Sequence, residues 1–318
     1  MLATACPRVT IMIPTYNQAQ YIREAIDSAL AQTYTNLEVI VGDDASTDDT
    51  QSIVNQICDP RLKYVRHPSN IGRTANYRSL LYVHATGDYV VNLDGDDYYI
   101  DPDFIIQAIK LIKNRKDIVL IVARAKWISA SIEYLSEVPE IKETDGIFLL
   151  KHLPDKSFFL KHMTTLYARK PAIKIGFYKS EFISSDWESL YRLSLRGKVI
   201  YLDRIVGFWR IHAMNETGTL NVDKLFGNLS IWPVIYKDAV LFGMSSFLAA
   251  LISARCVAFF AESGFVRASL TDNNEAASYF SLVLRNYKLA ALLLALSPSF
   301  WMRMTLAVFG YYRHKERR

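Results

Sequence analysis

Short apolar runs alternate with amphipathic segments over residues 8–114, and this alternation restricts the fold more than any other feature of the chain. The runs are rich in β-branched residues, and the segments between them space their apolar residues as one face of a helix does. The strand-like runs are 8–13, 37–41, 62–65 and 88–93, and the helix-like segments are 21–31, 50–57, 73–85 and 103–114. This order predicts parallel βαβ units, with helices on both faces of a mostly parallel, Rossmann-like sheet.

The middle of the chain is less regular. Residues 118–127 and 157–167 look like strands, whereas 129–156 shows no period and predicts a long loop over the site. The elements expected after this loop are a helix at 187–195 and two strands at 199–202 and 206–211.

The run at 88–93 stops in Asp94-Gly95-Asp96-Asp97, which places three carboxylates within four residues. Ligands of open α/β sheets bind just outside the carboxyl ends of the strands. Carboxylates this close repel one another unless a cation neutralises them, and hard oxygen ligands suit Mg²⁺ or Mn²⁺. An acidic turn is the alternative, because Asp-Gly is also a common turn dipeptide. We predict a divalent-cation site in this cluster.

Polar residues also follow the first two strand-like runs. Pro14-Thr15-Tyr16-Asn17 comes after the first and Asp43-Asp44 after the second, so all three strand ends are expected at one sheet edge. The Tyr16 ring can stack on a base, and the Asp44 carboxylate can accept a hydrogen bond from a base imide. The alternatives are a half-buried loop aromatic for Tyr16 and a helix N-cap cluster for Asp43 and Asp44.

Five ordered segments resemble the family 2 glycosyltransferases of the GT-A fold. They are 9–17 (VTIMIPTYN), 29–33 (ALAQT), 41–48 (VGDDASTD), 70–76 (NIGRTAN) and 85–97 (ATGDYVVNLDGDD). The resemblance covers roughly residues 8–215, about two-thirds of the chain. No single segment is decisive, but the ordered set is specific.

This resemblance implies an inverting enzyme that moves a sugar from a nucleoside-diphosphate sugar, with UDP as the expected nucleotide. The acceptor would be a hydroxyl of a glycan or lipid-linked molecule in cell-surface polysaccharide synthesis. The residues implied for the nucleotide sugar are Pro14, Tyr16, Asn17, Asp44, Arg73, Asp94 and Asp96. The cofactor implied is Mn²⁺ or Mg²⁺, held by Asp96, Asp97 and His212, with the direct ligand left open between the two aspartates.

A catalytic base is expected in the segment 184–188 (SSDWE). Inverting relatives carry an acidic base at the start of a helix in this region, and Asp186 fits that position with Glu188 as its competitor. Such a base must lie within hydrogen-bond reach of the acceptor hydroxyl. Relatives often show Glu-Asp where this chain has Ser185-Asp186, and helix capping is the alternative role for Asp186.

Other enzyme classes fit less well. No G-x-G-x-x-G follows the first strand, and the phosphate-loop lysine motif is missing. A sugar nucleotidyltransferase would carry a Gly-rich, Arg-containing loop in place of 14–17. A non-catalytic scaffold with a degenerate glycosyltransferase fold, docked on a membrane by its tail, would not need Asp96, Asp97 and Asp186.

The chain changes character after about residue 218, so we predict a catalytic domain at 1–218 and a helical region at 219–318. From Arg285 onward there are seven basic residues and one acidic residue, leaving 30 of the 37 basic and 31 of the 32 acidic residues before it. The uncharged stretches 239–254 and 289–301 are shorter than the roughly 18–20 residues of a spanning helix. Docking on an anionic membrane surface is therefore expected, with packing in a homodimer as the alternative.

Composition narrows the remaining classes. Half of the residues are apolar and 22% are charged, as in folded proteins. Three widely spaced cysteines show no disulfide or metal-binding pattern, which favours a reducing compartment. Because no secretory leader or nucleic-acid-reading module is apparent, we expect a cytoplasmic protein, peripheral on the inner face of the membrane, that binds no nucleic acid.

Overall fold

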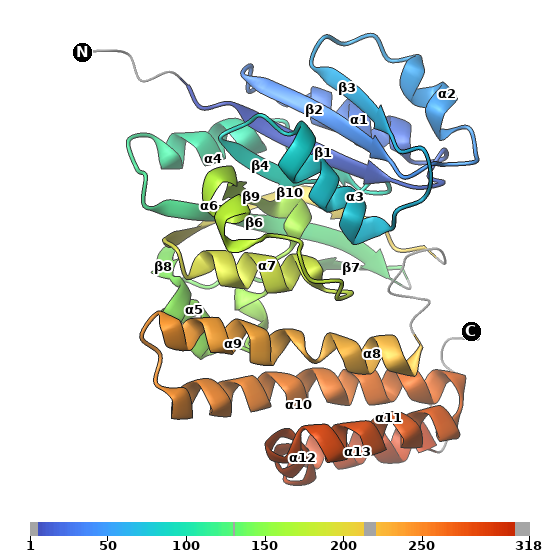
Figure 1. Cartoon of the computed structure of the whole chain (residues 1–318), viewed down its shortest axis with the longest axis vertical. Helices are drawn as coiled ribbons and strands as arrows, with labels where there is room; N and C mark the ends of the chain where they lie inside the picture. The colour runs from blue at the N-terminus through green and yellow to red at the C-terminus, as the bar shows by residue number, and fades with distance from the viewer. Residues whose placement is uncertain (1–5, 130, 213–220, 309–318) are drawn as a thin grey trace. The chain divides into compact units, whose positions relative to one another are not determined.

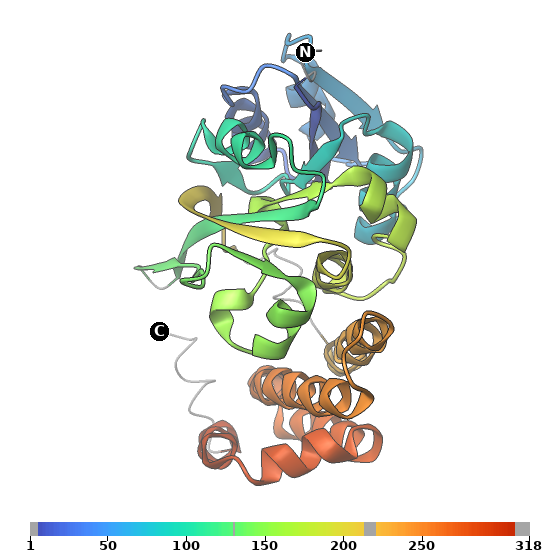
Figure 2. The same ribbon diagram turned by 90° about the vertical axis from the view of Figure 1, so that its left-hand side faces the viewer.

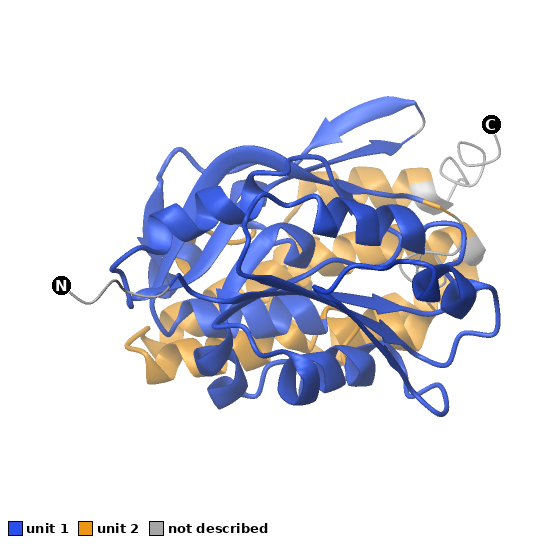
Figure 3. Ribbon diagram, turned by 90° about the horizontal axis from the view of Figure 1, so that it is seen from above, with its two compact units in different colours: residues 1–149, 156–181, 185–211 blue, residues 150–155, 182–184, 212–318 orange. Residues whose placement is uncertain are grey.

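A computed structural model describes residues 6–129, 131–212 and 221–308 of the protein. The chain forms two compact units, shown in different colours in Figure 3. Unit 1 comprises 1–149, 156–181 and 185–211, and unit 2 comprises 150–155, 182–184 and 212–318. The domain boundary predicted at residue 218 lies outside the described residues, so that division stays a prediction.

Unit 1 is built on a ten-stranded sheet, whose main path runs β3-β2-β1-β4-β9-β6-β10-β5. The strands are β1 (Val9–Thr15), β2 (Leu37–Asp43), β3 (Leu62–Arg66), β4 (Tyr89–Asn92), β5 (Tyr98–Tyr99), β6 (Ile118–Ser129), β7 (Ile132–Leu135), β8 (Glu143–Asp145), β9 (Thr165–Ala168) and β10 (Lys198–Trp209). Strands β1 to β4 are parallel, as predicted. Strand β9 is antiparallel to both β4 and β6, and β10 runs parallel to β6. The sheet is therefore mixed.

Helices cover both faces of this sheet (Figures 1 and 2). The helices of unit 1 are α1 (Ile22–Leu30), α2 (Thr50–Asn55), α3 (Arg73–Ser79), α4 (Phe104–Ile112), α6 (Arg169–Ile175) and α7 (Ser185–Ser194). Helix α5 (Gly146–His152) begins in unit 1 and ends in unit 2. Helices α1 and α4 share one hydrophobic core with the sheet, whereas α3, α6 and α7 pack on the strands from the other side. Helix α3 continues as a π-helical turn at Leu80–His84.

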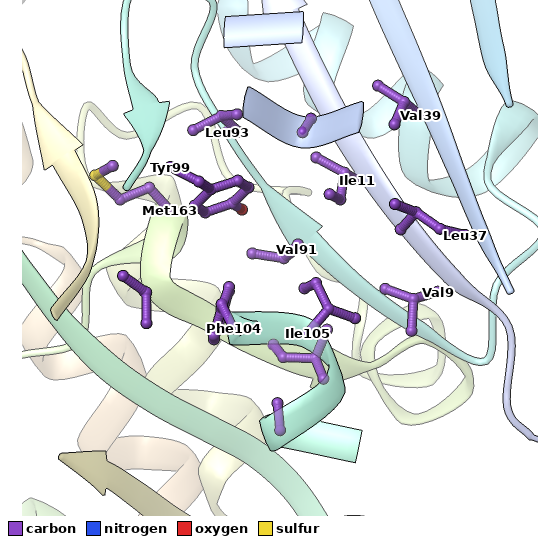
Figure 4. Packing of buried hydrophobic residues seen from close by; sticks show 14 of the residues in the cluster. Val9, Ile11, Leu37, Val39, Val91, Leu93, Tyr99, Phe104, Ile105 and Met163 are labelled. Atoms are coloured by element: carbon purple, nitrogen blue, oxygen red, sulfur yellow. The ribbon is translucent and has the colours of Figure 1, made fainter. Parts of the chain in front are cut away.

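The core on the α1 and α4 face follows the two-residue period of the strands. Ile11 and Ile13 of β1 belong to this cluster, whereas Met12 is buried against the opposite face. Figure 4 shows Val91 of β4 close to Phe104 of α4. Each such fully buried side chain contributes about 1.5–3 kcal/mol of hydrophobic stabilisation. The sheet edge that carries the site therefore rests on a rigid, well-packed support.

The first strand is longer than predicted. Strand β1 continues through Pro14 to Thr15, although a proline removes one N–H from a ladder. Strand β4 pairs only with Val9 to Met12, and the Pro14 carbonyl accepts a hydrogen bond from Gly95 N beyond the end of β4. The proline has no N–H to donate on that side, which agrees with the end of the β4 pairing at Met12.

The middle of the chain departs most from prediction. The expected loop at 129–156 contains β7, β8 and α5. The expected strand at 157–167 is instead two 3₁₀ turns, Lys156–Phe158 and His162–Thr164, followed by β9. The two strands expected at 199–202 and 206–211 are one strand, β10, with a register shift between Tyr201 and Ile205. That irregularity accommodates the polar pair Asp203-Arg204, which breaks the apolar pattern.

Unit 2 is mainly helical. Its helices are α8 (Val222–Asn228), α9 (Ile231–Leu241), α10 (Ser246–Thr271), α11 (Asn273–Asn286), α12 (Lys288–Ala295) and α13 (Pro298–Val308). Helices α11, α12 and α13 each pack on α10, and the rings of Phe265, Phe280 and Phe300 meet between them. The apolar stretch at 239–254 is broken by a turn in which Gly243 has φ of 96°.

Helix α10 is longer than the sequence pattern indicated. Its residues Ser246–Leu270 are long and apolar enough to cross a membrane, but half of their most apolar window is buried inside the protein. Helices α12 and α13 pass the same test only as a pair, and they are bent by 83°. Length and composition alone therefore do not assign either segment to a bilayer.

Candidate active site

The predicted convergence of three strand ends is confirmed. In the parallel registers Thr15 lies beside Asp43 and Met12 beside Asn92, so the ends of β1, β2 and β4 form one edge. Backbone hydrogen bonds extend this alignment past the strands, because Asp44 N donates to Thr15 O at 3.0 Å. The acidic cluster after β4 and the residues around Tyr16 after β1 therefore begin at adjacent strand ends.

Gly95 allows the acidic cluster to pack against β1. A Cβ atom at this position would lie 2.5 Å from Gln18 Oε1 and 2.9 Å from Thr15 Oγ1. The Gly95 N–H in turn donates to Pro14 O at 3.1 Å. A larger residue would require Gln18 to move and would crowd the Thr15 side chain, which favours glycine between the two carboxylates.

Asp94 is held by three side chains. Its Oδ1 accepts hydrogen bonds from Tyr77 Oη at 2.8 Å and Asn92 Nδ2 at 3.1 Å, and its Oδ2 lies 3.0 Å from His162 Nε2. Burial acts to raise the pKa of Asp94, but the charge of His162 and these hydrogen bonds outweigh it, so the pKa is lowered. Asp94 is thus a fixed, ionised carboxylate whose orientation is set by the protein.

Asp96 and Asp97 complete a cluster in which one ligand atom from each aspartate lies within 4.8 Å of the others. Burial, followed by the charges of Asp96 and Asp94, raises the pKa of Asp97 well above its usual range. A divalent cation would relieve this repulsion. Oxygens bound to one ion at about 2.1 Å are separated by about 3.0–4.2 Å, so the three carboxylates would draw closer together to hold such an ion.

The neighbours of the cluster favour Asp96 and Asp97 as the ligands. Both oxygens of Asp94 already have protein partners, whereas Asp97 uses Oδ1 to accept from Arg210 N at 2.9 Å. The Arg210 guanidinium donates to Asp96 O at 2.6 Å and pairs with Glu24 at 2.6 Å. Arg210 therefore fixes the backbone of the cluster and one oxygen of Asp97.

The structure places Asp186 in the first turn of α7, as predicted. Its Oδ2 lies 3.7 Å from His162 Nδ1, and its side chain keeps 17% of its accessible surface. His162 therefore stands between Asp94 and Asp186. Burial lowers the pKa of His162, but the two carboxylates and Asp97 outweigh it and raise the pKa to about 9. The imidazole is positively charged at neutral pH and faces both aspartates.

Glu188, the competitor of Asp186, has a different environment. Its side chain is fully buried and forms a 2.7 Å ion pair with Arg192 one helical turn later. Ser189 Oγ donates a further hydrogen bond to it at 3.2 Å. A carboxylate enclosed and paired in this way is not available to an acceptor, so Glu188 serves the packing of α7.

The residues expected to hold the nucleotide lie around the ends of β1 and β2. Tyr16 is 46% exposed, and no ring contact or hydrogen bond of its side chain is found within the described part of the chain. Asn17 adopts φ of 51° and accepts a hydrogen bond from Thr47 N at 2.8 Å, which ties the two strand ends together. Pro14 is buried inside β1, and its role at the nucleotide stays a prediction.

Asp44 has a structural role that the sequence did not indicate. Its two oxygens accept hydrogen bonds from Ile71 N at 2.7 Å and Gly72 N at 2.9 Å, which fixes the loop before α3. Each oxygen keeps a second lone pair that can accept from a base. Arg73 begins α3, lies 5.6 Å from the centre of the Tyr77 ring, and acts to lower the pKa of Asp94.

His212 is assigned to unit 2, whereas Asp96 and Asp97 belong to unit 1. The role of His212 as a third metal ligand therefore stays a prediction. Sequence reasoning missed four residues around the acidic cluster, namely Tyr77, Lys161, His162 and Arg210. Tyr77 lies in a segment predicted as a helix and Arg210 in one predicted as a strand, and neither prediction assigned a role to these two side chains. Lys161 and His162 fall where a strand was predicted, and a turn there has no sequence signal that we recognise.

Comparison with protein families gives a clear match. The model of glycosyl transferase family 2 matches residues 10–176, more than half of the chain. Chondroitin synthase of Pasteurella multocida is 28% identical over 223 residues, which cover 68% of this chain and 22% of that protein. An Escherichia coli UDP-Glc:alpha-D-GlcNAc-diphosphoundecaprenol beta-1,3-glucosyltransferase is 41% identical over 92 residues, 29% of this chain and 36% of that protein. An uncharacterised Mycobacterium bovis protein is 28% identical over 64% of this chain and 59% of its own length. The matches span less than two-thirds of these relatives.

Solved structures show the same fold at low sequence identity. Staphylococcus aureus TarS 1–349 in complex with UDP superposes with a TM-score of 0.64 at 17% identity, covering 96% of this chain and 92% of TarS 1–349. A Pyrobaculum calidifontis mannosyltransferase in complex with GDP-Man and Mn²⁺ gives 0.58 at 21% identity, covering 96% and 85%. The fold predicted from the sequence, GT-A with a helical C-terminal region, is confirmed. On the family model and this fold, the chain belongs to glycosyl transferase family 2.

Proposed function

We propose that this protein is an inverting glycosyltransferase that moves a sugar from a UDP-sugar to a hydroxyl of a glycan or lipid-linked acceptor in cell-surface polysaccharide synthesis. The observation that carries the proposal is the line Asp94–His162–Asp186, which sets a candidate base beside the acidic cluster at the strand ends. UDP is favoured because TarS was solved with UDP and the E. coli relative is named for UDP-Glc.

On the donor side, Tyr16 stacks on the base and Asp44 accepts its imide N–H, while Arg73 lies near the phosphates. Asp94 accepts from the ribose, and Asp96 and Asp97, with His212, hold Mn²⁺ or Mg²⁺. When bound, the cation supplies positive charge to the diphosphate as it departs. The rigid β1 and β4 ends fix these groups before the donor arrives, which reduces the entropy lost on binding.

On the acceptor side, Asp186 is the base. Its carboxylate takes the proton of the acceptor hydroxyl as that oxygen attacks the anomeric carbon. The bond between this carbon and the phosphate oxygen breaks from the opposite side, and the nucleoside diphosphate leaves with the electron pair. Because there is one displacement, the configuration at the anomeric carbon inverts once.

The test is sugar transfer measured with a panel of UDP-sugars and a diphosphoundecaprenol-linked acceptor in the presence of Mn²⁺. We expect acceptor-dependent release of UDP and a product whose anomeric configuration, read by NMR, is opposite to that of the donor. A retained configuration would refute the single displacement. UDP release absent throughout the panel would favour the scaffold, and pyrophosphate release from nucleoside triphosphates would favour the nucleotidyltransferase.

We also propose that unit 2 docks the enzyme on the cytoplasmic face of the membrane. Helices α12 and α13 expose large apolar side chains, at Leu289, Leu292, Leu296, Trp301 and Met302. Residues 285–308 contain Arg285, Lys288 and Arg303 and no acidic residue, and Arg303 pairs with Glu262 of α10 at 3.0 Å. Apolar side chains flanked by basic residues match an anionic lipid surface, where each basic residue contributes about 1 kcal/mol.

A double substitution tests this docking. Leu292→Glu with Leu296→Glu should reduce co-sedimentation with phosphatidylglycerol vesicles more than tenfold, because two exposed leucines lose burial and two negative charges are added. High salt should weaken binding of the unaltered protein. Val83→Glu, at a 73%-exposed position of unit 1, is the matched control. If the double variant instead converts a dimer to a monomer with vesicle binding unchanged, these helices form the homodimer contact.

A further inference from the structure

The ammonium group of Lys161 lies in a cage of two tryptophan rings. Its Nζ is 4.8 Å from the ring centre of Trp127 and 5.2 Å from that of Trp209. The tryptophans are register partners on β6 and β10, and their rings are 5.8 Å apart at an angle of 60°. Two strands and the turn before β9 thus hold the lysine in one place.

This cation has an unusual set of neighbours. Across residues 6–129, 131–212 and 221–308, no hydrogen bond or ion pair to Lys161 Nζ is found. Lys161 is partly buried, and an ammonium group offers three donors and is strongly hydrated, so placing it against apolar rings costs part of its hydration. The two ring faces offset part of this cost through cation–π attraction. The donors of this ammonium group are therefore available to an anionic ligand.

The position of Lys161 indicates where that ligand would come from. Burial lowers the pKa of Lys161, while the charges of Asp186 and Asp97 act to raise it. The ammonium group therefore interacts electrostatically with Asp186 and with the acidic cluster. The next residue, His162, joins Asp94 to Asp186. Trp209 of the cage is followed by Arg210, whose N–H donates to Asp97 Oδ1 at 2.9 Å, so the cage adjoins the acidic cluster. In the proposed function the transferred sugar and its phosphate would lie beside this cluster.

We infer that Lys161, caged by Trp127 and Trp209, binds an anionic oxygen group of the donor, supplied by the phosphate next to the sugar or by a carboxylate on the sugar itself. This inference rests on the proposed function, because it assumes a nucleotide sugar in this site. It adds a subsite for negative charge on the acceptor-facing side of the acidic cluster. A uronic acid donor would use it fully.

Calorimetric titration with UDP, UDP-glucose and UDP-glucuronate in Mn²⁺ tests the inference on Lys161→Met and Lys161→Arg. If the phosphate is bound, Lys161→Met should weaken all three ligands about tenfold. If the carboxylate is bound, the unaltered protein should prefer UDP-glucuronate to UDP-glucose about tenfold, and Lys161→Met should remove only that preference. Lys161→Arg keeps the charge and should lose less in either case. The inference would be overturned if Lys161→Met bound each of the three ligands with the same affinity as the unaltered protein does.

Control measurements show whether a loss of binding comes from Lys161 itself, from a loss of folding or from the wrong choice of donor. Lys126→Met removes a lysine that pairs with Glu133 at 3.5 Å on the β6–β7 hairpin, and it should bind every ligand as the unaltered protein does. Lys161→Met should melt at or above the unaltered protein, since it replaces a partly buried ammonium group by an apolar chain. If the unaltered protein binds no uridine nucleotide, the proposed donor falls, and pyrophosphate and glucuronate become the probes. Weaker binding of either to Lys161→Met supports the subsite, and equal binding refutes it.

Discussion

Asp186→Asn should abolish sugar transfer while leaving donor binding intact. The amide keeps the size and the helix-capping ability of the side chain but cannot accept a proton, and a positioned general base contributes about 10²–10⁴-fold to a rate. We expect the turnover number to fall by that factor with little change in the dissociation constant for UDP. Transfer kinetics combined with calorimetric titration of UDP measure both quantities.

Two further variants serve as controls for Asp186→Asn. Asp203→Asn alters a side chain that is 74% exposed and paired with Arg124, and it should transfer normally. Glu188→Gln breaks the buried pair with Arg192 and should lower the melting temperature, because removing one partner of a buried ion pair costs about 3–5 kcal/mol. Undiminished turnover in Asp186→Asn would place the base elsewhere.

Asp96→Asn combined with Asp97→Asn should remove the metal dependence of nucleotide binding. The unaltered protein is expected to bind UDP roughly a hundredfold more tightly in Mn²⁺ than in EDTA, or about 2.8 kcal/mol at 1.4 kcal/mol per tenfold. The double variant should bind weakly and equally in both. Equal affinity of the unaltered protein in Mn²⁺ and EDTA would exclude a metal role for this cluster.

The same variant makes an opposite prediction for stability. Burial and the charges of Asp96 and Asp94 raise the pKa of Asp97, which means that the ionised cluster is strained in the folded state at neutral pH. Neutral amides remove this repulsion, so the double variant should melt higher than the unaltered protein in EDTA. Asp27→Asn, at an exposed residue paired with Arg23, should melt like the unaltered protein and serves as the control.

The fold of the first half could be predicted because the apolar residues of each helix or strand there repeat with a single period. Apolar residues alternate in β1, as Ile11 and Ile13 on one face and Met12 on the other show, and the segment of α1 spaces its apolar residues for one helix face. The segment before β9 was misread because buried residues such as Leu160 and Met163 look like a strand while they pack from turns. Periodicity records burial, and burial does not require a strand.

The candidate site divides in the same way. The acidic cluster and the residues around Tyr16 were predictable because they follow strands whose ends must meet. Lys161 and His162 were not, because their importance comes from contacts with Trp127, Asp94 and Asp186, which are distant in sequence. The dual use of Asp44 was also hidden, since its partners at Ile71 and Gly72 are backbone groups that leave no pattern.

One imidazole in contact with both Asp94 and Asp186 makes the two halves of the site thermodynamically linked. A donor that displaces Asp94 changes the contacts of His162, and through them the orientation of Asp186. Linkage is reciprocal, so an acceptor that engages Asp186 must alter donor affinity by the same factor by which the donor alters acceptor affinity. Under the proposed mechanism, donor and acceptor would then influence each other's binding through a single side chain, whichever of the two arrives first.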